Sequence, residues 1–201
     1  MKRTLILLCI LPQFLFADEI KYKHTISLGA GVPNMTVSLF NIFNNYNNNF
    51  SAKGTGPFHL KYENRFHPHM SVGLNINTAS YDIRYVDNVL DTNKGQIVPN
   101  NVRIKGRNTA FNVRYNIHFL NPENFSKFDC YFGIGMGMRV GKPVLSSEYQ
   151  YYTPSIKLPN FSAIGFETTL GMRYFFTEKI GLYTEIGVAK SIAQLGLSVR
   201  F

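Results

Sequence analysis

A histidine and a serine two residues apart are the first groups in this sequence that could do chemistry. In "HPHMS" (67–71), His69 and Ser71 form a His-x-Ser pair. A serine hydroxyl beside a histidine base can attack an acyl group when a carboxylate orients the histidine. No glutamate follows about one strand later, and His69 lies in a short turn. The pair is therefore a weak indication of an enzyme, and we predict no catalytic residue.

Two other short motifs lose their chemical interpretation on inspection. His67 and His69 flank Pro68, but no cluster of Cys, Asp or Glu completes a metal-ligand set. The glycines of "GIGMG" (133–137) alternate within a strand-like run and precede no helix, so they do not form a phosphate loop. We therefore predict no metal and no cofactor.

The elements that carry these residues are strands. Apolar residues alternate with polar residues or glycine. In "TAFNVRYNIHF" (109–119), Phe111 and Val113 share one face, whereas Asn112 and Arg114 share the other. The eight such runs are 23–32, 58–66, 70–85, 109–119, 128–140, 164–176, 180–189 and 193–201. A phase slip near Ala79 indicates a β-bulge in the third run.

The connections between these runs alternate in length. Those after the second, fourth and sixth runs are short, whereas long loops are expected at 33–56, 86–104 and 141–160. An even number of strands with short turns at one end and long loops at the other is typical of outer-membrane barrels. Two aromatic girdles are expected at the membrane interfaces: Phe66, Phe119, Phe128, Phe176 and Phe201 near the short turns, and Phe58, Tyr81 and Tyr85 near the long loops. A soluble sandwich or lipocalin-like barrel also alternates. Here the polar face is rich in glycine and poor in lysine, and only 16% of residues are charged, which favours a narrow lumen.

The first seventeen residues predict a secretory signal peptide. Lys2 and Arg3 precede the apolar run 4–16, and Ala17 is a small residue before a polar segment. A single membrane anchor is the alternative, but the run is short for a span. Cleavage removes Cys9, so Cys130 has no intramolecular disulfide partner. The sequence thus predicts a signal peptide at 1–17 and, at 18–201, an all-β, eight-stranded antiparallel up-and-down transmembrane β-barrel in a bacterial outer membrane.

Charged residues of inward parity predict the contents of the lumen. An eight-stranded barrel is just wide enough for side chains to fill, and buried charges need partners. The expected lumen network consists of Glu63, Arg65, Arg114, Arg139, Glu167, Arg173, Glu185 and Arg200, with Lys61 and Arg84 also facing inward. Counting residues from the short turns pairs Glu167 with Arg139 and Glu185 with Arg173. Glu63 is expected to pair with Arg114 or another arginine of the lumen. This network predicts a salt-bridged plug; an anion-conducting lumen is the alternative.

The chain finishes on the alternating run "AQLGLSVRF", which we expect to pair with the first strand and close the barrel. A terminal Phe201, preceded by apolar Leu197 and Val199, resembles the assembly signal of Gram-negative outer-membrane proteins. The whole chain resembles the small OmpA/OmpX-like and opacity-like eight-stranded barrels. That resemblance implies insertion by the barrel-assembly machinery, and it says little about activity.

The long loops carry the remaining functional information. Arg103, Lys105, Lys94 and Lys142 are expected beside the phosphates of lipopolysaccharide, because cations near anionic lipid are stabilised. The formal net charge of +9 does not indicate nucleic acid, which a secreted barrel rarely meets. We therefore expect a structural or interaction role: membrane stabilisation, adhesion or recognition through loops 33–56, 86–104 and 141–160, and lipopolysaccharide contact. A narrow pore is the alternative, and a lipid-modifying enzyme is a third hypothesis.

Overall fold

The structure is a computed structural model that describes residues 20–44, 49–91, 95–122, 125–148, 164–188 and 191–201. The segment 1–17 that the sequence assigns to a signal peptide lies outside the described residues. The described elements are β1 (His24–Val32), α2 (Met35–Asn44), β2 (Ser51–His67), β3 (Met70–Asp91), β4 (Gln96–His118), β5 (Phe128–Val140), β6 (Val144–Ser147), β7 (Ile164–Phe175), β8 (Ile180–Val188) and β9 (Ala193–Arg200). No helix in these ranges is long and apolar enough to cross a membrane.

Eight of the strands close into an antiparallel barrel, as the alternation predicts. Each pairs with its neighbour along the chain, and β9 pairs with β1, so that Leu197 lies opposite Leu28 and Gly196 opposite Gly29. Backbone hydrogen bonds of 2.9 Å in both directions join His24 to Phe201. The predicted closure of the barrel by its last strand is therefore confirmed. The short strand β6 lies outside this ring and pairs only with β4.

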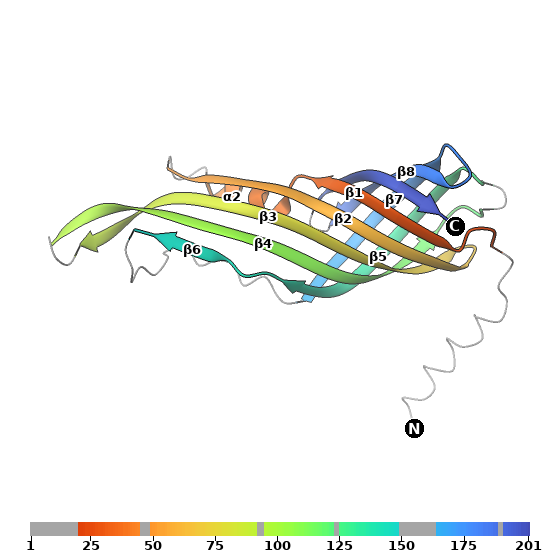
Figure 1. The fold of residues 1–201 in the computed structure, drawn as a ribbon, viewed down its shortest axis with the longest axis horizontal. Coiled ribbons are helices and arrows are strands. Elements are labelled where there is room, and N and C mark those ends of the chain that lie inside the picture. Colours follow the sequence, from red (N-terminus) through yellow and green to blue (C-terminus); the bar gives the residue numbers. More distant parts are fainter. Residues whose placement is uncertain (1–19, 45–48, 92–94, 123–124, 149–163, 189–190) are drawn as a thin grey trace, which may run out of the picture.

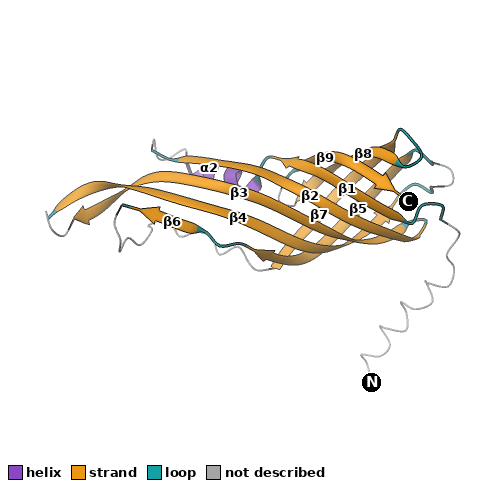
Figure 2. Cartoon of the chain, viewed as in Figure 1, coloured by secondary structure: helices purple, strands orange, loops and turns teal. Residues whose placement is uncertain are grey.

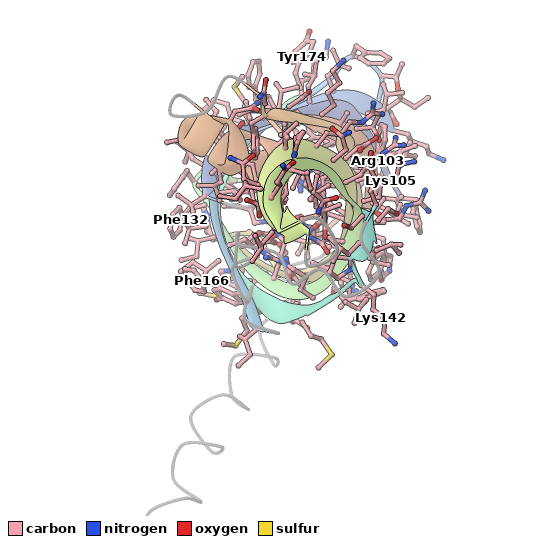
Figure 3. The ribbon with its side chains drawn as sticks, turned by 90° about the vertical axis from the view of Figure 1, so that its left-hand side faces the viewer. Arg103, Lys105, Phe132, Lys142, Phe166 and Tyr174 are labelled. Carbon is pink, nitrogen blue, oxygen red and sulfur yellow. The ribbon has the colours of Figure 1, made fainter. Side chains whose placement is uncertain are left out.

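The barrel is apolar outside and polar inside. Leu28, Met136 and Phe166 are each more than 60% exposed, whereas Asn75 and Glu185 on the inner face are at most 1% exposed. In Figure 3, the labelled Phe132, Phe166 and Tyr174 point away from the barrel axis. A soluble barrel has the opposite arrangement, so an exterior of this kind requires lipid around it. We call this exterior the apolar belt.

Aromatic side chains gather at the turn end of the apolar belt, as the sequence predicts. Phe119, Phe128, Phe176 and Phe201 are all exposed there, between 41% and 56%. Aromatic girdles of this kind mark the membrane–water interface of barrels.

The third and fourth strands are far longer than the sequence analysis predicts. The expected loop 86–104 is wrong, because β3 continues to Asp91 and β4 starts at Gln96. Their pairing is unbroken from Met70–Ile117 to Asp91–Gln96, so the bulge expected near Ala79 is absent from this pair. Figures 1 and 2 show the resulting hairpin projecting far beyond the other strands, at the end opposite the C-terminus.

One register shift of the β2–β3 pair lies instead in β2, between Thr55 and Phe58, and a second lies at its turn end, between Arg65 and His67. Gly56 has a φ of 78°, which favours glycine, and Pro57 has no N–H to donate to a ladder. These two residues therefore interrupt the pairing where β2 leaves the barrel and joins the projecting hairpin.

The projecting part, here named the sheet extension, consists of residues 51–55, 80–91, 96–107 and 144–147. Its inner face carries an apolar core in which Tyr81, Ile83 and Tyr85 pack with Phe40 of α2. The expected position of Tyr81 and Tyr85 in an outer aromatic girdle is therefore wrong. Both keep the inward parity of β3, but the environment has changed: beyond the belt the outside is water, so apolar residues turn inward.

The helix α2 lies within the expected loop 33–56 and covers this core (Figure 2). Two aromatic residues of this segment are packed: Phe40 is 5% exposed, and Phe50 stacks on Tyr85 with ring centroids 6.4 Å apart. Asn34 begins the helix, since its Oδ1 accepts a hydrogen bond from the N–H of Val37.

Candidate functional site

The lumen is lined by large charged side chains opposite glycines. Gly135 lies directly across from Glu167, and a Cβ atom at Gly135 would lie 2.7 Å from the Cγ of that glutamate. Gly171 faces the ring of Tyr131 in the same way. The alternating glycines of these strands therefore make room for the polar network, because the bore of an eight-stranded barrel is otherwise filled.

The first half of the network is centred on Glu185 of β8. Lys61 Nζ lies 2.7 Å from its Oε2, Arg114 NH1 lies 3.1 Å from its Oε1, and the hydroxyl of Tyr131 donates to it at 2.7 Å. Arg114 also reaches Glu167, with 3.4 Å between Nε and Oε1. We call this group the Glu185 cluster; Glu185 is 1% exposed, so its charge depends on these partners.

The second half is centred on Asp129 of β5. His118 Nδ1 lies 2.7 Å from Oδ1, and Arg65 donates to the same oxygen at 3.1 Å. Arg173 donates to Oδ2 of Asp129 at 3.0 Å and to both oxygens of Glu63 at 2.9 and 2.7 Å. This Asp129 cluster is more accessible than the first: the side chain of Arg65 is 12% exposed, whereas that of Lys61 is 6% exposed.

Tyr131 joins the two clusters. Its hydroxyl bonds to Glu185, and its ring lies 4.2 Å from the guanidinium carbon of Arg173. The four carboxylates of both clusters (Glu63, Asp129, Glu167, Glu185) are matched by four cations (Lys61, Arg65, Arg114, Arg173). A cavity of about 10 Å³ among these residues has room for roughly one water molecule. The described interior is therefore a compensated ionic core, which favours the plug over a conducting lumen.

Two of the pairs expected from counting residues are wrong. Glu167 was expected to pair with Arg139, but it lies opposite Gly135, four residues before that arginine. Its carboxylate instead meets Arg114. Glu185 likewise bonds to Lys61 and Arg114 rather than Arg173. Counting from the turns assumes that neighbouring strands start level, whereas the strands of a barrel are staggered by its shear.

Glu63 meets Arg173, which is the second of the two options left open by the sequence. Arg65 lies in the Asp129 cluster, and Arg139 is half-buried on the inner face near the belt's loop end. Arg84 faces outward instead of inward, because it lies in the sheet extension, where it bonds to Asp82.

Several members of the network were missing from the sequence prediction. Asp129, Tyr131 and His118 are all buried, and they share the inward parity of Gly133 or Arg114. That parity was the available signal. Asn75 and Asn112 also donate to Glu167, at 2.9 and 2.8 Å from Oε2, which the sequence analysis did not anticipate.

The His-x-Ser pair does not act as a pair in the structure. His69 Nδ1 bonds to the carbonyl oxygen of His118, whereas Ser71 Oγ lies 2.9 Å from Nε2 of His118, whose Nδ1 meets Asp129. Ser71, His118 and Asp129 thus have the connectivity of a hydrolase triad. Ser71 is nevertheless 0% exposed, and Asn116 donates to its hydroxyl at 3.2 Å. We interpret the arrangement as polar packing of the core.

The oxygen and nitrogen atoms of Glu63, His118 and Asp129 lie within 4.8 Å of one another, a spacing that a metal ion could use. Arg173 already bridges both carboxylates of this group. The guanidinium supplies the positive charge that an ion would supply, so we assign no metal site there.

Four cations gather outside the sheet extension, beyond the belt. Lys53, Lys105, Arg107 and Lys142 line a groove of about 570 Å³. Within the described residues, none of the four forms an ion pair with a carboxylate. Figure 3 shows Lys105 and Lys142 on the outside of the ribbon. We call this surface the cationic groove.

The lipopolysaccharide-contact residues predicted from the sequence divide between this groove and its surroundings. Lys105 and Lys142 line it, and Lys94 lies outside the described residues. Arg103 lies in the middle of β4 and donates to both oxygens of Asp82, at 2.9 and 2.6 Å. Its charge is therefore partly neutralised, whereas Lys53 and Arg107 line the groove and form no ion pair within the described residues.

The Asp82–Arg103 pair has a characteristic pH dependence. Hydrogen bonds from Arg103 and then Arg84 hold the pKa of Asp82 well below its usual range. A carboxyl whose pKa is depressed by folding stabilises the folded state above its unfolded pKa, near 4, and this contribution is lost as pH falls.

We expect Asp82→Asn to weaken the sheet extension at pH 7 by less than about 1 kcal/mol, because the pair is solvent-exposed. The difference from the parent protein should shrink as the pH falls below about 4, the pKa of an aspartate in the unfolded chain. Hydrogen exchange of the Ile83 and Ile104 amides at several pH values measures it. Glu148→Gln removes a carboxylate at the end of β6 that forms no ion pair within the described residues, and it is the control. An equal difference at pH 7 and pH 2 contradicts the prediction.

The residues of the expected assembly signal lie on the last strand and its end. Leu197 and Val199 are 53% and 42% exposed on the apolar belt, and Phe201 stacks on His24 with ring centroids 5.5 Å apart. All three therefore face outward at or near the closing seam of the barrel.

The fold and the lumen together define the class of this protein: a closed eight-stranded antiparallel barrel of the transmembrane type, with an ionic core.

No protein-family model matches the chain, and no curated protein matches it. Among solved structures, the chain is similar to the attachment invasion locus protein Ail of Yersinia pestis in complex with the heparin analogue sucrose octasulfate, with 11% identity and a TM-score of 0.42, over 90% of this chain and 100% of that chain. It is also similar to the N-terminal β-barrel domain of Pseudomonas aeruginosa OprF, with 13% identity and a TM-score of 0.38, over 90% of this chain and 100% of that chain. Because both scores are low, the class is defined by the strand pairing, belt and lumen of this chain.

Proposed function

We propose that the protein is an integral barrel of a bacterial outer membrane with a structural and interaction role, and that the cationic groove contacts the phosphates of lipopolysaccharide. The observation that carries this proposal is the position of four cations just beyond an apolar belt, none of them in an ion pair within the described residues. The plugged lumen supports a role outside transport. Export through a cleaved signal peptide and insertion by the barrel-assembly machinery complete the proposal.

The height of the groove supports a lipid-phosphate contact. Phe111 and its partner Ile76 belong to the belt. Arg107 and Lys105 lie four and six residues before Phe111 in β4, toward the sheet extension. At about 3.3 Å per residue and a tilt of about 40°, these cations lie roughly 10 and 15 Å above those belt residues. Phosphate groups of the outer leaflet occupy this zone, and each nearby cation contributes about 1 kcal/mol.

The sheet extension and α2 supply a folded surface further from the membrane. A sheet with its own apolar core can hold side chains in fixed positions, as recognition requires. We therefore assign loop-mediated adhesion or recognition to this part of the chain rather than to unstructured loops.

We expect the double variant Lys105→Gln/Arg107→Gln to lose about 2 kcal/mol of the stabilisation that lipopolysaccharide confers, since two cations are removed. The urea midpoint of the mature protein is measured in vesicles with lipopolysaccharide and in zwitterionic vesicles. Lys127→Gln/Lys179→Gln removes two lysines at the turn end and is the matched control. If both double variants respond equally to lipopolysaccharide, the groove is not its contact.

A further inference from the structure

A cavity of about 600 Å³ lies at the turn end of the barrel, opposite the sheet extension. We call it the turn-end chamber. Lys21, Tyr22, Ser126 and Glu178 form part of its rim, and Arg65 and Arg173 form part of its inner wall. It is separate from the cationic groove, which lies beyond the other end of the barrel.

The rim is held together by Arg200, the last charged residue of β9. Its Nε donates to the carbonyl oxygen of Glu178 and its NH2 to that of Ser126, both at 2.7 Å. The guanidinium carbon lies 4.6 Å from the ring centre of Tyr22 and 3.9 Å from that of Phe175. The hydrogen-bond acceptors of Arg200 are thus neutral carbonyl groups, and within the described residues its guanidinium forms no ion pair with a carboxylate.

The segment before β1 closes part of the rim. The hydroxyl of Tyr22 donates to Glu178 at 2.9 Å, Lys21 lies 3.5 Å from the same carboxylate oxygen, and Ile20 is 7% exposed. Glu178 is therefore engaged by its own neighbours, and it attracts Arg200 only at a distance longer than that of an ion pair.

The inner wall offers donors without acceptors. Arg65 binds Asp129 through NH2, but its Nε is buried and meets no acceptor within the described residues. The same holds for Nε of Arg173, whose side chain is 4% exposed. Buried N–H groups are normally bonded, and an exception points to an absent partner. The lining as a whole carries five lysines and arginines against three carboxylates.

The remaining lining is aromatic and apolar. Tyr22, Phe125 and Phe175 contribute to it, together with Pro68. Cavities that combine apolar walls with a few converging polar groups are typical of small-molecule sites. Arginine donors in such surroundings recognise carboxylate and phosphate groups.

We propose that the turn-end chamber binds a small organic anion, in which a carboxylate or phosphate group is carried on an aromatic body. The oxyanion binds between Arg65 and Arg200, and the aromatic body packs against the rings of Tyr22 and Phe175. The ligand enters from the turn side, because the ionic core fills the lumen behind the chamber. The lipopolysaccharide proposal plays no part in this site.

The test is a titration of the mature protein, residues 18–201, folded in detergent micelles and observed by amide NMR. Benzoate and phenyl phosphate are the probes, and benzylammonium, an aromatic cation, is the charge control. We expect saturable shifts at the amides of Ser126, Lys127 and Thr177 with at least one anionic probe, and none with benzylammonium. The tighter probe distinguishes a carboxylate site from a phosphate site.

Arg65→Gln should raise the dissociation constant at least tenfold, whereas Lys179→Gln, next to the chamber but outside its lining, should change it less than twofold. If Arg65→Gln does not fold, Arg65→Lys keeps the charge beside Asp129 but loses the Nε donor, and it should also weaken binding. Equal shifts with benzylammonium, no saturation with either anion, or unchanged affinity in the folded Arg65 variant overturns the proposal. Inorganic phosphate binding as tightly as phenyl phosphate overturns the role of the aromatic walls.

Discussion

Replacing Glu185 with alanine should destabilise the folded barrel by about 3–5 kcal/mol, because the substitution leaves buried charges without a partner. Lys61 and Arg114 both lose their closest carboxylate, and the hydroxyl of Tyr131 loses its acceptor. Glu185 is 1% exposed, so bulk water does not readily replace these contacts. The urea midpoint of the mature protein in lipid vesicles measures the effect.

Glu178→Ala is the matched control for this prediction. Its carboxylate also pairs with a lysine, Lys21, but the two side chains are 76% and 72% exposed. Exposed pairs contribute about 0–1 kcal/mol, so the control should barely move the midpoint. A midpoint of Glu185→Ala that matches the control would show that the Glu185 cluster is not a structural core.

Glu167→Ala should cost less than Glu185→Ala. Arg114 loses a contact of 3.4 Å but keeps Glu185 at 3.1 Å, while Asn75 and Asn112 lose an acceptor. No cation is left entirely without a carboxylate in this variant. The ranking of the two variants therefore separates loss of charge compensation from loss of hydrogen bonds.

The barrel itself could be predicted from the sequence because one physical rule applies along every strand. Residues such as Leu28 and Phe166 must face lipid, and alternate residues such as Ser27 and Glu167 must face the lumen. This rule correctly predicts eight barrel strands, their parity and the pairing of β9 with β1. It needs only local alternation, which a single sequence contains.

The ion pairs could not be predicted in the same way, because they depend on the stagger between strands. Glu167 lies opposite Gly135 and not Arg139, and no local pattern in either strand reports that offset. The long arginine and lysine side chains add a second uncertainty. Arg114 reaches Glu185, on a strand that does not pair with its own, so even a correct register would not define its partner.

The sheet extension was missed because its inward positions continue those of the barrel but carry apolar residues, whereas the inward positions of the barrel carry polar residues. In β3, Leu74 and Ile76 face outward within the belt, whereas Tyr81 and Ile83 face inward beyond it. A pattern that assumes one environment interprets this reversal as a bulge. The reversal is in fact the sequence signature of a strand that leaves the membrane and continues into water.

Replacing Ile83 with alanine should therefore loosen the sheet extension while leaving the barrel intact. Ile83 is 1% exposed in the core formed with Phe40, Tyr85 and Ile104, and truncating a buried isoleucine to alanine costs about 2–5 kcal/mol. The ionic core and the belt lie elsewhere on the strands and make no contact that depends on this side chain. We expect amide exchange to accelerate by at least tenfold between residues 80 and 107, with unchanged protection of the β8–β9 pair.

Ile97→Ala, at a 71% exposed position on the same hairpin, is the control, and it should change neither the exchange of the extension nor that of β8–β9. Equal loss of protection in the extension and in β8–β9 would show that the two parts unfold as one unit, contrary to the division of the chain into a membrane barrel and a separately packed outer sheet.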